Sequence, residues 1–225
     1  MTSFYSNFLW EFNPEMAKKR GVISTPHEVV DYILNGIDFL LKKLFKRKMG
    51  ILDAEITFLD PASGLMNFPA RLVHFASTKY QDSHGKLVRW FETEFRKNIF
   101  TFEVLVSPYL LGYLRMVITA KNFGIETSNA TKPLLNSFLF NTLTGRAKGS
   151  VKSSYYDYEL ERAFNIRDHQ NFTVIMGNPP YSVSTQNKSD WINEKMMDYK
   201  DGLLEKNIQP LSDDYVKFIR FAQWK

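Results

Sequence analysis

The sequence contains no cysteine, which excludes a disulfide framework and any metal site built on thiolates. It has no apolar run near the roughly 18–20 residues that a membrane-spanning helix needs, so we expect no membrane partner. The first residues, Met1–Tyr5, lack the basic and then apolar layout of a secretory signal peptide. Together these absences predict an intracellular, cytoplasmic protein.

Motifs for several common kinds of catalysis are also absent. The sequence has no Gly-x-x-x-x-Gly-Lys-Ser/Thr loop that would cradle phosphates and no Gly-x-Ser-x-Gly elbow for a nucleophilic serine. The pair Asp213–Asp214 fits the charged start of a helix better than a metal site. We expect no metal, and we interpret the histidines as ordinary surface or core residues: His27, His74, His84 and His169.

The composition is that of a folded domain with a mild excess of positive charge. A chain of 225 residues, 44% hydrophobic and 24% charged, suffices for one α/β domain with a sizeable core. The net charge of +5 is compatible with a nucleic-acid partner but is weak evidence alone. The basic residues at 42–48 fit a solvated helix end better than a DNA-facing patch.

Hydrophobic periodicity and turn residues predict helices that alternate with short strands. The predicted helices cover 27–48, 68–79, 87–98, 107–122 and 159–169, with further helices in 191–225. The predicted strands cover 56–59, 99–102, 137–140 and 172–177, and the segments 145–158 and 182–187 are predicted to be irregular. This alternation is typical of an α/β fold with a mostly parallel sheet and crossover helices.

Two local details accompany this assignment. Thr25 is a good N-cap for the first helix, and Pro26 suits its first helical position. In the last helix, one face is predicted to carry the apolar residues Tyr215, Phe218, Ile219 and Ala222.

The most distinctive segment is Asn178-Pro179-Pro180-Tyr181, directly after the last predicted strand. Two consecutive prolines remove two backbone donors and restrict φ twice, which makes the turn rigid and extended. The Asn178 amide and a neighbouring carbonyl can accept hydrogen bonds from an amino group, and the Tyr181 ring can stack on a planar ring. The segment therefore predicts a receptor for a planar ring that carries an amine, such as adenine.

Polar residues also stand at three other strand ends, where the ligands of open α/β sheets bind. In segment 60–64 (Asp-Pro-Ala-Ser-Gly), Asp60 can hold an amino group and Gly64 allows a ligand close to the backbone. Glu103 can accept from both hydroxyls of a ribose, and Asn141 can bond to an adenine edge. Each has a plainer interpretation, as a capped turn, a solvated carboxylate or a helix cap, and the residues alone leave both open.

In their order along the chain, these motifs resemble the DNA adenine-N(6) methyltransferase family. The likeness is strongest to the large fused restriction-modification enzymes that share its catalytic domain. It runs through segments 21–26, 60–64, 102–103, 140–143 and 178–181, and so covers nearly the whole chain. It implies a Rossmann-like methyltransferase fold that binds S-adenosylmethionine. The Asn-Pro-Pro-Tyr segment is strongly specific for methyl transfer to amino groups. The other motifs are weak evidence individually, and their order along the chain strengthens the resemblance.

The resemblance also implies a role for each matching residue. Asn178 and the carbonyl of Pro179, in a turn kept rigid by Pro180, would accept from the target amine. Tyr181 would stack on an adenine flipped out of double-stranded DNA. Glu103 would hold the ribose of the methyl donor. The complete set that would bind S-adenosylmethionine is Thr25, Pro26, Asp60, Ala62, Gly64, Glu103 and Asn141.

The chain departs from the family pattern in two places. Segment 65–69 follows Gly64 where the family commonly has a second glycine. The chain ends at Lys225, whereas the family carries further strands and its recognition region downstream. We therefore expect a truncated chain with a helical segment at 1–50 that closes over the donor site. Residues 51–225 would be the methyltransferase core without its C-terminal strands. A specificity region, nuclease or helicase would be encoded separately or lost.

These inferences predict methyl transfer from S-adenosylmethionine to the exocyclic amine of adenine in DNA, within a restriction-modification system. Two alternatives stay open at this point. One is a non-catalytic remnant that at most binds donor or DNA, which the missing strands favour. The other is a methyltransferase for protein glutamine or rRNA, because Asn-Pro-Pro-Tyr also occurs in such enzymes.

Overall fold

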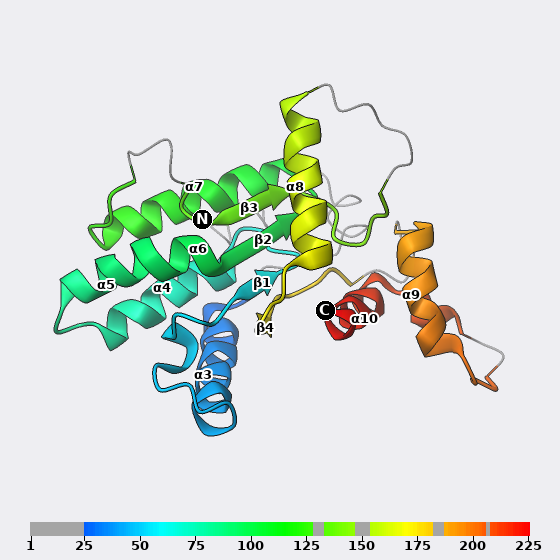
Figure 1. Cartoon of the computed structure of the whole chain (residues 1–225), viewed down its shortest axis with the longest axis horizontal. Helices are drawn as coiled ribbons and strands as arrows, with labels where there is room; N and C mark the ends of the chain where they lie inside the picture. Colours follow the sequence, from blue (N-terminus) through cyan, green and yellow to red (C-terminus); the bar gives the residue numbers. More distant parts are fainter. Residues whose placement is uncertain (1–24, 128–132, 147–153, 182–186, 206–207) are drawn as a thin grey trace.

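The computed structural model describes residues 25–127, 133–146, 154–181, 187–205 and 208–225. Its strands form one parallel sheet in the order β3-β2-β1-β4 (Figure 1). The strands are β1 (Phe58–Asp60), β2 (Ile99–Glu103), β3 (Asn136–Leu139) and β4 (Val174–Ile175). The predicted α/β fold with a parallel sheet is confirmed for this part of the chain and is consistent with a Rossmann-like fold.

The strand order reverses direction at β1. The chain passes from β1 to β2 and then to β3 on one side, and returns to pair β4 with the other side of β1. Leu59 in β1 lies opposite Phe100 of β2 and opposite Ile175 of β4. The carboxyl ends of β1 and β4 therefore adjoin at the point where ligands bind in sheets of this kind.

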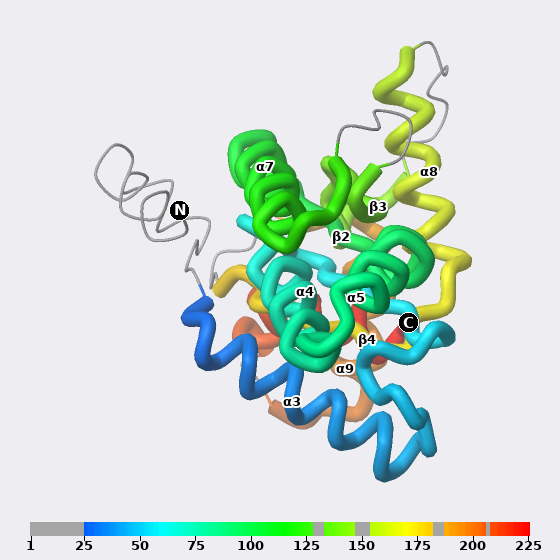
Figure 2. The backbone as a smooth tube through the Cα atoms, turned by 90° about the vertical axis from the view of Figure 1, so that its left-hand side faces the viewer, coloured from blue at the N-terminus to red at the C-terminus, as the bar shows by residue number. Residues whose placement is uncertain are grey.

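Helices cover both faces of the sheet (Figures 1 and 2). Those before β3 are α3 (His27–Lys43), α4 (Asn67–Lys79), α5 (His84–Trp90), a π-helical turn (Phe91–Phe95), α6 (Arg96–Asn98) and α7 (Val106–Asn122). Those after it are α8 (Tyr155–His169), α9 (Asp190–Lys200) and α10 (Asp214–Trp224). Short 3-10 turns lie at Gly50–Leu52 and Gln209–Ser212.

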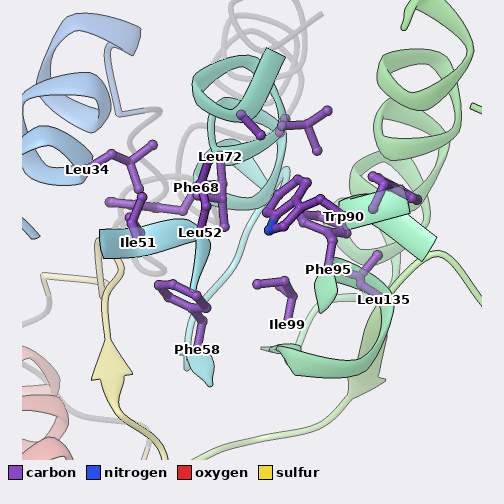
Figure 3. Packing of buried hydrophobic residues seen from close by; sticks show 14 of the residues in the cluster. Leu34, Ile51, Leu52, Phe58, Phe68, Leu72, Trp90, Phe95, Ile99 and Leu135 are labelled. Atoms are coloured by element: carbon purple, nitrogen blue, oxygen red, sulfur yellow. The ribbon is translucent and has the colours of Figure 1, made fainter. Parts of the chain in front are cut away.

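Two hydrophobic clusters fill the space between sheet and helices. In β1, Phe58 belongs to the first cluster and Leu59 to the second, as expected from the alternation of side chains along a strand. The first cluster joins α3, α4, α5 and α7 to the sheet (Figure 3), and the second joins α8, α9 and α10. Since the second cluster is rich in phenylalanine, much of the high aromatic content is core.

The structure corrects the predicted bounds of the first helix. Helix α3 ends at Lys43 instead of Lys48, because Lys46 adopts a left-handed conformation with φ of 57° and turns the chain away. The N-cap is Pro26, without a side-chain cap, so the prediction of Thr25 as N-cap was wrong. Residues 1–24 of the predicted N-terminal segment lie outside the described residues.

Helix α8 also starts earlier than predicted, at Tyr155. The Ser154 hydroxyl accepts from the Asp157 backbone N–H at 3.2 Å, and the Asp157 carboxylate accepts from the Ser154 N–H at 3.0 Å. This reciprocal capping box begins the helix within the segment predicted to be irregular, 145–158. Residues 147–153 of that segment, and 182–186 of the other, lie outside the described residues.

The strands and the last helix differ from prediction in detail. Strand β1 is shifted along the chain and includes Asp60, while β4 is only two residues long. In α10, Phe218 and Phe221 are buried, whereas Tyr215 is exposed over 38% of its surface, so the predicted apolar face was partly wrong. The other predicted helices and strands are present with small changes at their ends. Within the described ranges, no helix combines the length and apolar character needed to cross a membrane.

Candidate functional site

The turn between β1 and α4 has a backbone shaped for close approach. Gly64 has a φ of 52°, which glycine adopts at little cost, and a Cβ placed there would meet no atom within 4 Å. Met66 adopts the same left-handed region with a φ of 55°, although it is a buried non-glycine residue. Backbone strain of this kind concentrates at functional sites, so the turn is a candidate ligand site.

Asp60 is a buried carboxyl at the end of β1, with only 2% of its surface exposed. Its Oδ1 accepts a 3.2 Å hydrogen bond from the Ala62 N–H, while its Oδ2 is buried without a hydrogen-bond partner. Burial raises the pKa of Asp60 from 3.8 to about 8; the bond from Ala62 opposes this rise, and Glu103 adds to it. The buried Ser63 hydroxyl also lacks a partner. The turn thus holds polar groups that a ligand could satisfy.

Glu103, at the end of β2, supports this turn directly. Its Oε2 accepts from the Gly64 N–H at 2.8 Å, and its Oε1 accepts from the Leu105 N–H at 2.7 Å. The carboxylate therefore ties the glycine of the turn to the segment that leads into α7. Because each carboxylate oxygen has a second lone-pair site, this structural role is compatible with binding a diol.

The loop after β3 is tied to the same turn. The buried Thr142 hydroxyl donates to the Pro61 carbonyl at 2.6 Å, which draws the end of β3 across β2 to the end of β1. The neighbouring Asn141 accepts from the Leu143 N–H at 3.1 Å, and its amide donates to the Asn187 side chain at 2.9 Å. No helix begins at Asn141 in the described residues, so its plainer interpretation as a helix cap was wrong; its side chain instead stabilises the turn at 141–144.

The segment Thr25–Pro26 packs beside the first residue of α4, the helix that follows the turn between β1 and α4. The Asn67 amide donates to the Thr25 carbonyl at 3.4 Å. Arg115 of α7 donates both to the Asn67 side chain and, at 3.2 Å, to Nε2 of His27. Burial and the nearby Arg115 lower the pKa of His27, which favours the neutral ring that accepts this bond. The sequence analysis did not single out Arg115, because nothing local marks a long-range contact.

The Asn178–Tyr181 segment follows β4 after two residues, Met176 and Gly177. The Met176 N–H donates to the Leu59 carbonyl at 3.0 Å, which carries β-type pairing up to the segment. The Tyr181 hydroxyl donates to Oδ1 of Asn178 at 2.9 Å. The Tyr181 ring stacks on Tyr215 of α10, with ring centroids 5.1 Å apart and planes at 20°. Tyr215 is an aromatic residue of this site that the sequence analysis assigned to a helix face.

Gly177 joins the two halves of the site. A Cβ at this position would lie 2.7 Å from Oδ1 of Asp60, closer than real Cβ contacts. The residue before the Asn178–Tyr181 segment is thus in contact with the carboxyl of the β1 turn. Nine predicted site residues stand at or just after the carboxyl ends of the four strands of the sheet. Five are predicted to bind the methyl donor (Asp60, Ala62, Gly64, Glu103 and Asn141), and four form the predicted catalytic segment (Asn178, Pro179, Pro180 and Tyr181).

We expect Gly177→Ala to destabilise the fold by about 1–3 kcal/mol, because the methyl group has no room beside Asp60. Chemical denaturation at pH 7 measures this change. The matched control is Gly36→Ala in the middle of α3, where a Cβ would meet nothing within 4 Å. The free energy of unfolding of that control should rise by up to about 1 kcal/mol, because alanine has a higher helix propensity than glycine. Equal effects of the two substitutions would contradict the close contact.

Among the described residues, no group of three or more His, Asp or Glu side chains is arranged to hold a metal ion. Two of the described histidines make contacts of other kinds. Nε2 of His84, for example, lies 2.8 Å from the Phe123 carbonyl, and the His74 ring packs edge-on against Phe123. The polar groups of the candidate site are therefore carboxylates, amides and hydroxyls.

Comparisons with protein-family models and with curated proteins find no match to this chain. Comparison with solved structures finds likeness over 98% of the chain. A DrdV–DNA complex solved by cryo-electron microscopy is 26% identical, with a TM-score of 0.76. A nuclease-deletion mutant of the Type ISP restriction-modification enzyme LlaGI, in complex with a DNA substrate mimic, is 22% identical with a TM-score of 0.73. The ATP-dependent Type ISP restriction-modification enzyme LlaBIII, bound to DNA, is 21% identical with a TM-score of 0.77.

The chain corresponds to one part of these much longer polypeptides. It spans 21% of the DrdV chain, 20% of the LlaGI chain and 15% of the LlaBIII chain. The likeness shows that the chain has a fold found within restriction-modification enzymes that were solved with DNA.

Proposed function

We propose that this chain is the catalytic part of a site-specific adenine DNA methyltransferase of a restriction-modification system. The reaction transfers the methyl group of S-adenosylmethionine to the exocyclic amine of adenine: the N–CH3 bond forms, the S–CH3 bond breaks to leave S-adenosylhomocysteine, and the amine loses one proton. One observation carries the proposal: at the point where the strand order reverses, the buried carboxyl of Asp60 lies against Gly177, the residue that leads into Asn178–Tyr181. A candidate donor turn and a candidate amine receptor are therefore adjacent.

The residues of the turn between β1 and α4 fit S-adenosylmethionine, the proposed methyl donor. Oδ2 of Asp60 is a buried oxygen without a partner, and it can accept from the amino group of the methionine end once the carboxyl loses its proton. The Glu103 carboxylate is an acceptor suited to the two ribose hydroxyls, and Asn141 carries an amide suited to the adenine ring. Gly64 leaves room for the ligand beside the backbone, and Thr25–Pro26 lie within reach at the start of α4. When bound, the donor supplies an electrophilic methyl group.

The residues of the Asn178–Tyr181 segment bind and orient the target. Oδ1 of Asn178 and the carbonyl of Pro179 accept the two N–H bonds of the amine, which directs its lone pair toward the methyl group. Fixed acceptors also stabilise the positive charge that develops on the nitrogen during transfer. Neither proline has an N–H, so these two residues offer no backbone donor that would compete with the amine. Tyr181 stacks on the adenine after it leaves the duplex, and fixed orientation lowers the barrier further.

The likeness to restriction-modification enzymes solved with DNA supports DNA as the substrate. Under this proposal, residues 1–50 close over the donor and residues 51–225 form the methyltransferase core. Recognition of a DNA sequence, and any nuclease or helicase, then belongs to other parts of a larger assembly. Such a system acts on DNA in the cytoplasm.

The test is transfer of a radiolabelled methyl group from S-adenosylmethionine to DNA, followed by digestion to nucleosides. We expect label in N6-methyladenine, from mixed-sequence duplex DNA and from an adenine-rich single strand that needs no base flipping. A glutamine-containing peptide and rRNA serve as competing substrates. Label that enters the peptide or rRNA in preference to DNA would contradict the choice of substrate. Absence of label in every substrate would contradict methyl transfer.

A further inference from the structure

The receptor for the target amine is occupied by the protein's own side chains. Oδ1 of Asn178 already accepts a 2.9 Å hydrogen bond from the Tyr181 hydroxyl, although the proposed reaction needs this oxygen for the amine. One face of the Tyr181 ring is covered by Tyr215, at a centroid distance of 5.1 Å. Tyr181 and Tyr215 are 49% and 38% exposed as residues, so the stacked pair lies at the surface.

Tyr215 is presented by a well-anchored helix end. The Asp213 side chain caps α10 by accepting from the Tyr215 N–H at 2.8 Å. Over the next two turns of the helix, Phe218 and Phe221 are buried in the second hydrophobic cluster. The first turn of α10 therefore holds the Tyr215 backbone in place, and its ring can leave Tyr181 mainly by side-chain rotation.

The start of α10 is also connected to Asn141, one of the residues proposed to bind the methyl donor. The buried Asp214 accepts from the Asn187 amide at 3.0 Å, and Lys217 donates to the Asn187 carbonyl. Asn187 in turn accepts from the Asn141 amide at 2.9 Å. Because Asn141 is the proposed contact of the donor's adenine, the helix that carries Tyr215 is fastened to the donor site by a continuous set of hydrogen bonds.

We propose that Tyr215 is a latch that keeps the amine receptor closed until a target adenine replaces it. In the closed state, Tyr215 stacks on Tyr181, and Tyr181 occupies the acceptor of Asn178. Adenine offers a stacking surface in place of Tyr215 and an amine in place of the Tyr181 hydroxyl, so it substitutes for both contacts. This inference rests on the proposed function, since it assumes that Asn178 receives an exocyclic amine.

The latch competes with the ligand, so removing it should tighten binding. An aromatic stack and a neutral hydrogen bond each have a typical strength that corresponds to roughly two- to tenfold in an equilibrium constant. Tyr215→Leu should therefore raise the affinity for both adenosine and purine riboside, which lacks the amine, by roughly two- to tenfold. Tyr181→Phe should raise the affinity for adenosine alone, because only an amine competes with the hydroxyl for Asn178.

Isothermal titration of the full chain with each nucleoside, in the presence of S-adenosylhomocysteine, tests these expectations. Ile219→Ala is the matched control, since Ile219 lies one turn from Tyr215 on α10 and is similarly exposed at 41%. Thermal unfolding checks that each variant is folded, and Tyr181→Phe, which removes a single oxygen, keeps the test open if Tyr215→Leu does not fold.

The outcomes separate the latch from the function on which it rests. Weaker or unchanged nucleoside binding by Tyr215→Leu, or no gain for adenosine in Tyr181→Phe, overturns the latch. The proposed function survives that result if the wild type still prefers adenosine to purine riboside and Asn178→Ala removes the preference. A wild type without such a preference overturns the amine receptor itself, and the latch with it.

Discussion

Replacing Asp60 by asparagine should make the folded chain more stable at neutral pH while weakening donor binding by one to two orders of magnitude. The carboxyl is buried, its Oδ2 has no partner, and its pKa is raised to about 8. Ionisation of this group in the folded chain therefore costs free energy that the unfolded chain does not pay. Asparagine keeps an acceptor for the Ala62 N–H and removes the charge.

The sign of the pH effect follows from the raised pKa. The folded state holds the Asp60 proton more tightly than the unfolded state does. The protonated carboxyl therefore contributes most to stability below pH 3.8, the ordinary pKa, and this contribution is lost as the pH rises to about 8. Relative to Asp60→Asn, the free energy of unfolding of the wild type should fall by about 1.4 kcal/mol per pH unit within that window. Above pH 8 the difference should become constant.

Urea denaturation of both proteins between pH 5 and pH 9 measures this difference. Asp82→Asn is the matched control, because Asp82 is exposed in the turn between α4 and α5. It controls for the loss of one negative charge at the surface. Parallel curves for the wild type and Asp60→Asn would mean that Asp60 does not carry a displaced pKa.

Donor binding provides the second half of this prediction. A charge-assisted hydrogen bond contributes about 1.5–3 kcal/mol, and its loss in Asp60→Asn should weaken S-adenosylmethionine binding roughly 10- to 100-fold. Binding to the wild type below pH 8 should release the Asp60 proton, which calorimetry in buffers of different ionisation enthalpy detects as a buffer-dependent heat. If Asp60→Asn gains stability but binds S-adenosylmethionine like the wild type, Asp60 does not contact the methyl donor.

Asn178→Ala should lower the rate of methyl transfer by about 100- to 1000-fold, the usual cost of removing one preorganised group that stabilises charge in a transition state. Affinity for S-adenosylmethionine should stay within about twofold of the wild type, because in the proposed function Asn178 contacts the target amine and not the methyl donor. Single-turnover transfer and donor titration on the same protein measure the two quantities separately. Loss of both together would show that these roles were assigned incorrectly.

The control for this variant is Asn171→Ala. Asn171 is an exposed asparagine before β4, and its backbone carbonyl, which the substitution keeps, accepts from the Thr57 hydroxyl at 3.1 Å. The Asn171 variant should transfer methyl groups at the rate of the wild type. Because Asn178→Ala also frees the Tyr181 hydroxyl, comparison with Tyr181→Phe separates loss of the amine acceptor from release of the ring.

Most helices and strands could be predicted because their signals are local. The apolar spacing of α7 and the β-formers of β2 specify these elements within a few residues of their ends. The errors arose where one residue or contact overrides the pattern. Lys46 ends α3 through a left-handed backbone conformation, and the Ser154–Asp157 capping box starts α8 early.

The candidate site was predictable only in part. Asp60, Glu103, Asn141 and Asn178 stand out in the sequence because each polar residue follows an apolar strand. Their contacts were not predictable, and neither was the part played by Tyr215, which sequence pattern alone assigned to an apolar helix face. That pattern cannot distinguish a ring that packs in a core from one that stacks on another exposed ring.

By itself, the sequence determined the strand–helix alternation, the polar strand ends and the rigid Asn-Pro-Pro-Tyr turn, since each depends on neighbouring residues. Only the tertiary structure decided that the ends of β1 and β4 adjoin, that Asp60 is buried against Gly177 and that Tyr215 covers Tyr181. These contacts join residues that are far apart in the chain. They exist because sheet pairing and helix packing fix distances that local patterns leave free.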